Sequence, residues 1–233
     1  METTEQKKNI GGLFNRIAPS YDILNHGLSL GVDIRWREKA VATLQPRTRC
    51  VLDVAAGTAD LSLMLVKEGR AHHVTGIDLS EGMLEVGRRK VHAAGEDGKI
   101  ELIQADVTEL PFEDGIFDAV TCAFGVRNFS HLQEGLDEMY RVAAPKSRLA
   151  ILEFGMPRNK IVGAAYNWYF TRVLPWIGGI VSKEKQAYAY LPASVKLFGY
   201  GQPFMEKLQR AGFHNVKMKL LSAGICILYT ARK

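Results

Sequence analysis

The chain has 233 residues, of which 47% are hydrophobic and 24% are charged, so it can bury one sizeable core and is not a disordered polymer. The net charge of +5 is spread along the sequence, and its densest run, Arg88-Arg89-Lys90, has no aromatic residues beside it. This pattern argues against nucleic acid as a partner and leaves weak attraction to an anionic bilayer as the better use of the charge.

Residues 1–46 read as a helical cap. Apolar residues recur there at helical spacing, Pro19 and Gly27 divide the region, and Pro46 ends it. The first residues are polar and lack the apolar segment of a secretory signal, so we expect a cytoplasmic protein.

Residues 47–155 alternate between short apolar strands and amphipathic helices. Strands are expected at 50–54, 73–78, 100–104, 117–122 and 149–154, with helices at 59–68, 80–94 and 131–142. Ser80, followed by Glu81, has the chemistry of a helix N-cap. The alternation predicts an α/β fold with a mostly parallel sheet covered by helices on both faces.

Residues 156–200 form an insertion between the core and the tail. Its segment 161–181 carries one charge, Arg172, and is long enough to cross a membrane. Pro175 and the pair Gly178-Gly179 break it, so we expect two short apolar helices. Two interpretations stay open, a cover for the sheet and an apolar lid that touches a membrane.

Residues 201–233 close the chain with a helix at 203–211 and two strands at 216–221 and 225–231. The connection Ser222-Ala223-Gly224 is so short that the two strands must pair antiparallel. This finish is typical of Rossmann-like class I S-adenosylmethionine-dependent methyltransferases, and the four segments together are expected to make a single domain.

The loop after the first strand is the first candidate cofactor site. It reads Asp53-Val54-Ala55-Ala56-Gly57-Thr58, and it lacks the G-x-G-x-x-G pattern that a dinucleotide pyrophosphate needs. S-adenosylmethionine has no phosphate but carries cationic groups, which Asp53 can attract, while Gly57 lets the turn pass close and Thr58 offers a hydroxyl.

Two further carboxylates follow the next strands. Asp78 can accept hydrogen bonds from both ribose hydroxyls, and Asp106 with Val107 can bracket the adenine edge. Since the carboxyl ends of parallel strands share one edge of the sheet, the three aspartates are expected to meet around one ligand.

The loop Phe124-Gly125-Val126-Arg127-Asn128-Phe129 follows the fourth strand and is expected to project over the reacting methyl group. The three cysteines have no CxxC pairing and the six histidines no metal-ligand spacing, so we expect reduced thiols and no metal.

These motifs resemble the ubiquinone/menaquinone biosynthesis C-methyltransferase family over nearly the whole chain. The most specific are the loop 124–129 and the segment Tyr21-Asp22-x-Leu24-Asn25, and further ones are Trp36-Arg37, Leu152-Glu153-Phe154 and Tyr190-Leu191-Pro192. The family's turn usually reads Ala-Gly-Gly-Thr-Gly-Asp, so Ala56 and Ala59 stand here for glycines that accept positive φ more readily.

The resemblance implies methyl transfer from S-adenosylmethionine to a ring carbon of a prenylated quinol, with demethylmenaquinol as the first choice. Cofactor contacts then fall on Thr58, Asp78, Asp106 and Val107, with Ala123 where the family often has a small polar residue. Arg127 is the candidate for stabilising the phenolate and Asn128 for orienting the ring, while Tyr21, Asp22 or a water held by them would remove the proton.

Three alternatives stay open: C-methylation in the ubiquinone pathway, methylation of another small phenol, and a non-catalytic subunit that binds S-adenosylmethionine. The aromatic residues Trp168, Tyr169, Phe170 and Trp176 could line a path for the isoprenoid tail, which favours the lid and peripheral contact with a membrane. The sequence leaves open whether the chain is a monomer or a homo-oligomer.

Overall fold

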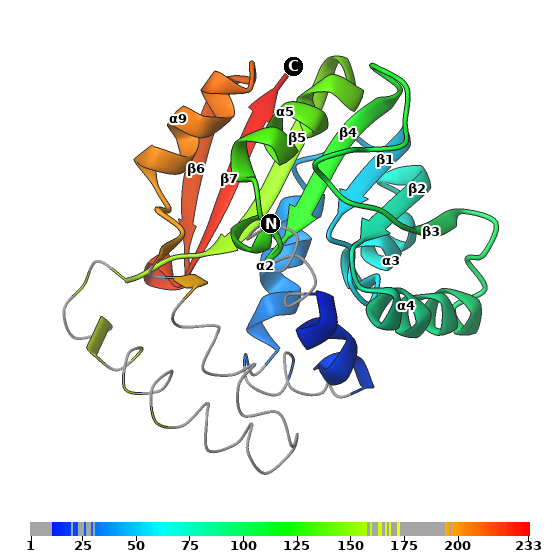
Figure 1. Ribbon diagram of the computed structural model, residues 1–233, viewed down its shortest axis with the longest axis horizontal. Helices are drawn as coiled ribbons and strands as arrows, with labels where there is room; N and C mark the ends of the chain where they lie inside the picture. Colours follow the sequence, from blue (N-terminus) through cyan, green and yellow to red (C-terminus); the bar gives the residue numbers. More distant parts are fainter. Residues whose placement is uncertain are drawn as a thin grey trace.

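The computed structural model describes residues 11–19, 21, 22, 26, 29, 31–157, 159, 163, 164, 166, 168, 172, 194, 195 and 197–233. Within these residues one sheet has the strand order β3-β2-β1-β4-β5-β7-β6 (Figure 1). Its strands are β1 Thr48–Val54, β2 Ala71–Asp78, β3 Ile100–Gln104, β4 Phe117–Ala123, β5 Ala143–Phe154, β6 His214–Leu221 and β7 Cys226–Arg232.

The first five strands pair parallel, whereas β7 pairs antiparallel with both β5 and β6. The expected parallel sheet with a C-terminal antiparallel hairpin is therefore confirmed. The short connection between the last two strands is a 3-10 turn, Ser222–Gly224, which leaves no room for a crossover.

Helices cover both faces of the sheet. The helices are α2 Val32–Val41, α3 Asp60–Lys67, α4 Glu81–Ala93, α5 Leu132–Val142 and α9 Gln202–Arg210. One apolar core joins α5 and α9 to the sheet through side chains such as Leu136 and Phe204, and a second core joins α2, α3 and α4 through Val41, Leu65 and Leu84. The inner strands β1 and β4 are thus buried on both sides, which explains their mostly apolar sequences, whereas the edge strand β3 exposes Glu101 and Gln104.

The N-terminal helical residues are tied to the start of α4. Residues 11–19 are helical, and the Asn15 side-chain oxygen accepts hydrogen bonds from Ser80 Oγ at 2.6 Å and from the Gly82 backbone N–H at 2.8 Å. Ser80 is the N-cap of α4, as expected, and accepts from the Met83 N–H at 3.3 Å. The cap segment therefore lies next to the carboxyl end of β2.

Strand β5 is longer than the sequence pattern predicts. It starts at Ala143, directly after α5, and not at residue 149. Its register against β4 shifts between Phe117 and Ala119, and Lys146 has φ of 67°. Residues 145–148, which lie before the predicted strand 149–154, are thus an irregular stretch inside β5.

The expected lid, residues 156–200, lies mostly outside the described residues, and so do Tyr169, Phe170 and Trp176. Among the described ones, Trp168 is 63% exposed and Leu197 is 86% exposed. No helix in the described part of the chain is both long and apolar enough to cross a bilayer.

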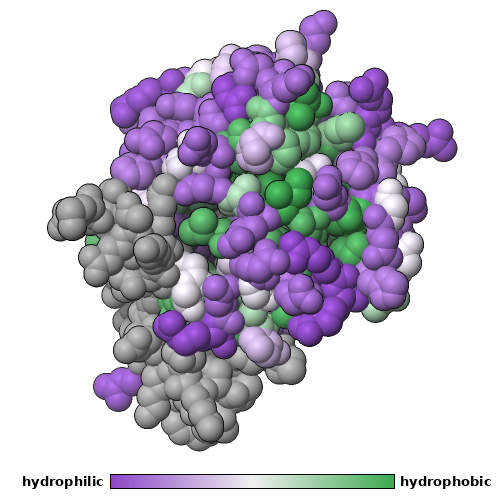
Figure 2. All heavy atoms as spheres, turned by 45° about the vertical axis from the view of Figure 1, so that its right-hand side comes forward, coloured by the Kyte–Doolittle hydropathy of each residue, from purple (hydrophilic) through white to green (hydrophobic). Residues whose placement is uncertain are grey.

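Figure 2 shows apolar side chains gathered in a central area of one face, with hydrophilic side chains around them.

Candidate functional site

Two adjoining pockets lie at the carboxyl ends of β1, β2 and β4, and they share Tyr21, Ala55, Gly57 and Ala123. The larger pocket has about 810 Å³ of empty space counted to its mouth, and the smaller has about 330 Å³. This is the edge of the sheet at which the sequence places its aspartates.

The loop after β1 bends under the larger pocket with a left-handed backbone. Ala55, Gly57 and Ala59 have φ of 55°, 56° and 65°. Ala56 keeps an ordinary φ, so only one of the two alanines that stand for family glycines, Ala59, has the strained conformation. The loop is held to β2 because the Ala56 N–H donates to the Ile77 carbonyl at 2.9 Å.

Asp78 lines the larger pocket and organises the turns around it. One carboxylate oxygen accepts from the Gly57 N–H at 2.9 Å, and the other accepts from the Ser80 N–H at 2.8 Å. Burial raises the pKa of Asp78 above its ordinary value, and these backbone hydrogen bonds offset part of the rise. Each oxygen keeps a second lone pair for a ligand hydroxyl.

Asp106 and Val107 line the larger pocket on the side of β3. The Asp106 carboxylate accepts from the Thr108 N–H at 2.9 Å and from the Thr108 hydroxyl at 2.8 Å, which fixes its orientation. Val107 packs beside Gly135 of α5, where a Cβ would lie 3.1 Å from the valine methyl group. The ends of β2 and β3 thus present two oriented carboxylates to one hollow.

Asp53 lies deeper than the other two aspartates and lines the smaller pocket. It is 1% exposed, and its carboxylate accepts from the Ser62 hydroxyl at 2.6 Å and from the Thr121 hydroxyl at 2.9 Å. Burial raises the pKa of Asp53 to about 6 despite these hydrogen bonds. The three aspartates therefore share one edge of the sheet but not one pocket.

Thr58 also lines the smaller pocket, and its hydroxyl donates to Asp22 at 2.5 Å. Lys90 Nζ bonds the other oxygen of Asp22 at 2.7 Å and also bonds Asp60. Asp22, His26 and Asp60 come within 4.8 Å of one another, a spacing that a metal ion could use. Because the Lys90 ammonium already lies against both carboxylates, the group is an ion-pair network that joins the cap to α3 and α4.

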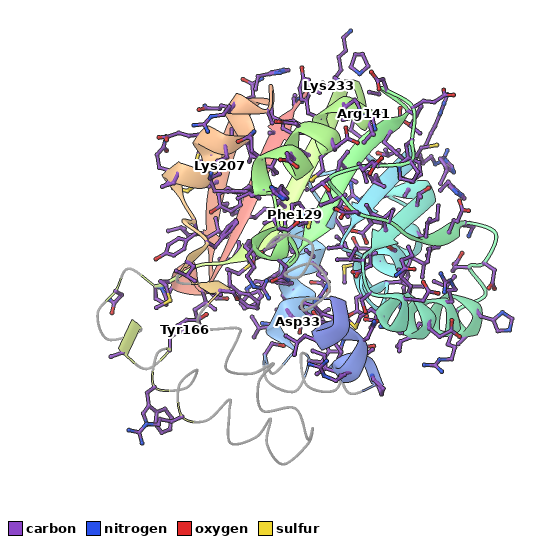
Figure 3. All side chains as sticks on the ribbon, in the orientation of Figure 1. Asp33, Phe129, Arg141, Tyr166, Lys207 and Lys233 are labelled. Carbon is purple, nitrogen blue, oxygen red and sulfur yellow. The ribbon has the colours of Figure 1, made fainter. Side chains whose placement is uncertain are left out.

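The loop after β4 approaches the β1 loop closely. A Cβ on Gly125 would overlap the Ala55 Cβ and lie 3.0 Å from Cys122 Sγ, so only glycine fits there. Phe124 has φ of 62° although it is neither glycine nor asparagine. Such strain in a non-glycine residue clusters at functional sites. Asn128 and Phe129, the latter labelled in Figure 3, line the larger pocket from this loop.

Arg127 lines neither of these two pockets. Its side chain is 7% exposed, and Nη1 donates to Glu153 at 2.8 Å and also to the Phe124 carbonyl. Glu153 is fully buried and also accepts from the Arg127 backbone N–H at 3.2 Å. The guanidinium predicted to meet the substrate is thus anchored behind the loop.

Four side chains form a continuous stack behind the site. Phe124 and Phe154 stack with ring centroids 4.6 Å apart, Arg37 lies 5.3 Å from the Phe124 centroid, and Arg127 lies 5.4 Å from the Phe154 centroid. The guanidinium groups therefore cover the outer faces of an aromatic pair. The stack links the smaller pocket, which Arg37 lines, to the loop that carries Arg127.

The predicted site residues fall into three groups. Those that line the larger pocket are Tyr21, Gly57, Asp78, Asp106, Val107, Ala123 and Asn128, and Asp53 and Thr58 join at the smaller one. Asp22 bonds Thr58 of this set, whereas Arg127 bonds Phe124 and Glu153, which lie outside it. Sequence reasoning named Arg37 and Glu153 only as parts of family motifs and Phe124 only as part of the loop 124–129, and it gave none of the three a role of its own at the site. The signal for Glu153 was a charge inside an apolar strand, and Arg37 follows Asp33 by one helical turn.

A sequence model of the ubiE/COQ5 methyltransferase family matches residues 1–233. The chain is 42% identical over 230 residues to "Demethylmenaquinone methyltransferase" of Bacteroides fragilis, covering 98% of this chain and 94% of that protein. It is also 42% identical over 233 residues to "Ubiquinone/menaquinone biosynthesis C-methyltransferase UbiE" of Geotalea daltonii, covering 99% and 98%.

The fold is similar to that of solved methyltransferases. A crystal structure of a SAM dependent methyltransferase from Aquifex aeolicus aligns with a TM-score of 0.60 at 20% identity, covering 84% of this chain and 88% of that one. Identity at that level shows the shared architecture, and the chemistry must be argued from the site.

Proposed function

Because the chain belongs to the ubiE/COQ5 methyltransferase family, we propose that it transfers the methyl group of S-adenosylmethionine to a ring carbon of a prenylated quinol, most simply demethylmenaquinol. C-methylation in the ubiquinone pathway is the second candidate, since one relative carries a name that spans both pathways.

One observation carries the proposal: oriented carboxylates at the ends of β2 and β3 face a pocket without a pyrophosphate-binding glycine pattern. Asp78 is proposed to bind the ribose hydroxyls and Asp106 with Val107 to bind the adenine, since all three residues line the larger pocket. Gly57 and Gly125 let backbone approach the ligand, and the smaller polar pocket continues from the larger one. The residues present therefore fit S-adenosylmethionine.

When bound, the cofactor supplies an electrophilic methyl group. The chain's task is to hold the quinol ring beside the pocket and to stabilise the negative charge on its oxygen. Asn128 lines the pocket and can orient the ring or a water. Arg127 Nη1 is committed to Glu153 and the Phe124 carbonyl, and its Nε is buried without an acceptor among the described residues, so Nη2 and Nε are the donors left to meet a phenolate.

Proton removal from the quinol hydroxyl is assigned to a water that the Tyr21 hydroxyl orients and that carries the proton to solvent. Tyr21 lines both pockets, whereas the carboxylate of Asp22 is already bonded to Thr58 and Lys90. We therefore place Asp22 as a support for the cap segment and Tyr21 as the residue that faces the reaction.

The isoprenoid tail is proposed to leave the site along the insertion 156–200, which we continue to interpret as a lid. Its exposed side chains Trp168 and Leu197 could also rest on a membrane surface. Such contact would be peripheral, and the net positive charge would favour anionic lipid.

The test is to incubate the protein with labelled S-adenosylmethionine and a panel of prenylated demethylated quinols, and to identify the products by mass. Methylated menaquinol is the expected product. Arg127→Ala should nearly abolish its formation while cofactor binding persists. Cofactor binding without turnover on any quinol would instead indicate a non-catalytic subunit.

A further inference from the structure

The smaller pocket is lined by charged side chains of both signs. Its lining combines one cation, Arg37, with the buried carboxylate of Asp53 and the half-buried Asp60. It opens into the larger pocket through Tyr21, Ala55, Gly57 and Ala123. A ligand that extends from the larger pocket into this one would meet opposite charges close together.

We propose that Arg37 binds the carboxylate of the amino-acid end of S-adenosylmethionine, while Asp53 attracts its ammonium group. This assignment rests on the proposed function, since it presumes that the adenosine half lies between Asp78 and Asp106. It adds Arg37, on α2, as a cofactor-binding residue that discriminates the α-amino acid group from a plain amine.

The guanidinium of Arg37 is held in place, but not all of its N–H donors have an acceptor. Nη1 donates to Asp33, which is labelled in Figure 3, while Nη2 lies 3.8 Å from Asp60 Oδ2, beyond hydrogen-bond distance. Nε is buried and has no acceptor among the described residues. The Phe124 ring supports the flat group from one side. A buried arginine with donors to spare is the usual partner of a carboxylate.

Lys90 is the competing cation in this neighbourhood, but its ammonium is already occupied. It bonds Asp22 and Asp60 and lies 3.4 Å from the Thr58 hydroxyl, and it does not line the pocket. His26 bonds Asp33 at 2.9 Å and lies 3.3 Å from Asp60, and it does not line the pocket either. Arg37 is therefore the group that a carboxylate in the smaller pocket reaches first.

The ion pairs of Arg37 also explain how its guanidinium is accommodated at 6% exposure. Asp33 holds one side of the guanidinium and is itself bonded by the Ser29 hydroxyl at 2.5 Å and by His26. The Asp33 carboxyl has a lowered pKa, to which the Ser29 hydrogen bond and the charge of Arg37 contribute against its desolvation. The pair is thus a preformed clamp, so little ordering remains to be done when a ligand arrives.

The experiment compares two ligands by isothermal titration calorimetry, S-adenosylmethionine and decarboxylated S-adenosylmethionine, which keeps the sulfonium and the amine. The wild type should bind the carboxylated ligand about ten to one hundred times more tightly, as expected for a charged hydrogen bond. Arg37→Met should bring this ratio close to one, and Arg37→Lys should keep part of it.

Arg35→Met is the matched control, because Arg35 lies on the same helix but is exposed. It should keep the wild-type ratio. The double variant Asp33→Asn/Arg37→Met removes the carboxylate that the single variant leaves unpaired, and it should show the same ratio near one in a well-folded protein. A ratio within one variant does not depend on the fraction of folded protein.

Two results would overturn the assignment while leaving the proposed function intact. One is a wild type that binds both ligands equally. The other is an Arg37→Met variant that loses affinity for both ligands by the same factor, which would mark Arg37 as a purely structural residue. A wild type that binds neither ligand would overturn the proposed function as well.

Discussion

The substitution Asp53→Asn should weaken cofactor binding and at the same time stabilise the folded protein. The Asp53 carboxyl is 1% exposed and has its pKa raised by burial from 3.8 to about 6. Folded chains therefore bind more protons than unfolded ones between about pH 4 and 6, and the stability contributed by this group falls as the pH rises through that window. At pH 7 the ionised carboxylate is a net cost.

The magnitude follows from the two pKa values. The difference between 3.8 and about 6 corresponds to about 3 kcal/mol at neutral pH, which is the upper limit of what the asparagine substitution could recover. The amide can be accommodated because the Thr121 hydroxyl, now a donor to Asp53 at 2.9 Å, also lies 3.4 Å from the Leu52 carbonyl and can turn to it. It can then accept from the amide.

Binding should show the opposite trend. If the ionised carboxylate attracts the cofactor's ammonium, wild-type affinity for S-adenosylmethionine should fall about tenfold from about pH 7 to about pH 5, because most Asp53 is then protonated. The variant should bind about tenfold or more weakly at about pH 7 and should match the wild type near pH 5. Asp78 remains in both proteins, so its contribution to the pH dependence is common to the two.

The assays are calorimetric titration with S-adenosylmethionine over the same pH range and urea unfolding at neutral pH. His26→Gln is the control, since His26 lies beside Asp33 and Asp60 but does not contact Asp53 in any described interaction. It should keep the wild-type pH dependence. The reasoning is refuted if Asp53→Asn has the same pH dependence of affinity as the wild type, or if it lowers the free energy of unfolding by more than about 1 kcal/mol.

Three further substitutions test the packing of the site. Gly125→Ala should lower the free energy of unfolding by about 1–3 kcal/mol and weaken cofactor binding, because the added methyl group overlaps Ala55. The control Gly98→Ala, whose added methyl group has no atom within 4 Å, should do neither. Identical urea-unfolding curves for the two variants would contradict this prediction. Glu153→Gln should lower the free energy of unfolding by about 3–5 kcal/mol, because it leaves the buried Arg127 charge unpaired. Glu134→Gln, on the exposed surface of α5, should change it very little. Similar unfolding midpoints for the two variants would show that the buried pair does not stabilise the fold. The variant Ala59→Gly should be about 1–2 kcal/mol more stable than Ala56→Gly, because of these two alanines only Ala59 has a positive φ. If the two variants have the same thermal unfolding midpoint, backbone strain at Ala59 is not the reason.

Much of the fold could be predicted because local patterns encode it. Strand β3 begins and ends where the apolar run 100–104 predicts, and Ser80 caps α4 as its hydroxyl chemistry suggests. The start of β5 could not be predicted, since Ala143 continues directly from α5 and the Pro145-Lys146 stretch has turn-like composition. Pairing with β4, a contact distant in sequence, keeps that stretch in the sheet.

The candidate site, like the fold, has features that the sequence predicts and others that only the packing reveals. The order of the strands and the aspartates that follow them are sequence properties, so Asp78 and Asp106 could be assigned to one pocket before any coordinates. The sequence could not tell that Asp53 is buried beneath Ser62 and Thr121, or that Arg127 is paired with Glu153, because these partners lie 9 to 68 residues away along the chain.

By itself, the sequence determined the parallel sheet, the closing hairpin, the family and the edge of the sheet at which the aspartates and the two pockets lie, since each depends on local periodicity or on motifs that are contiguous in the chain. Only the tertiary structure decided which charges are paired, which are buried and which remain available to a ligand, Arg37 among them. Burial and pairing are properties of neighbours in space, and the packing of α2 against Phe124 and the β1 loop brings those neighbours together.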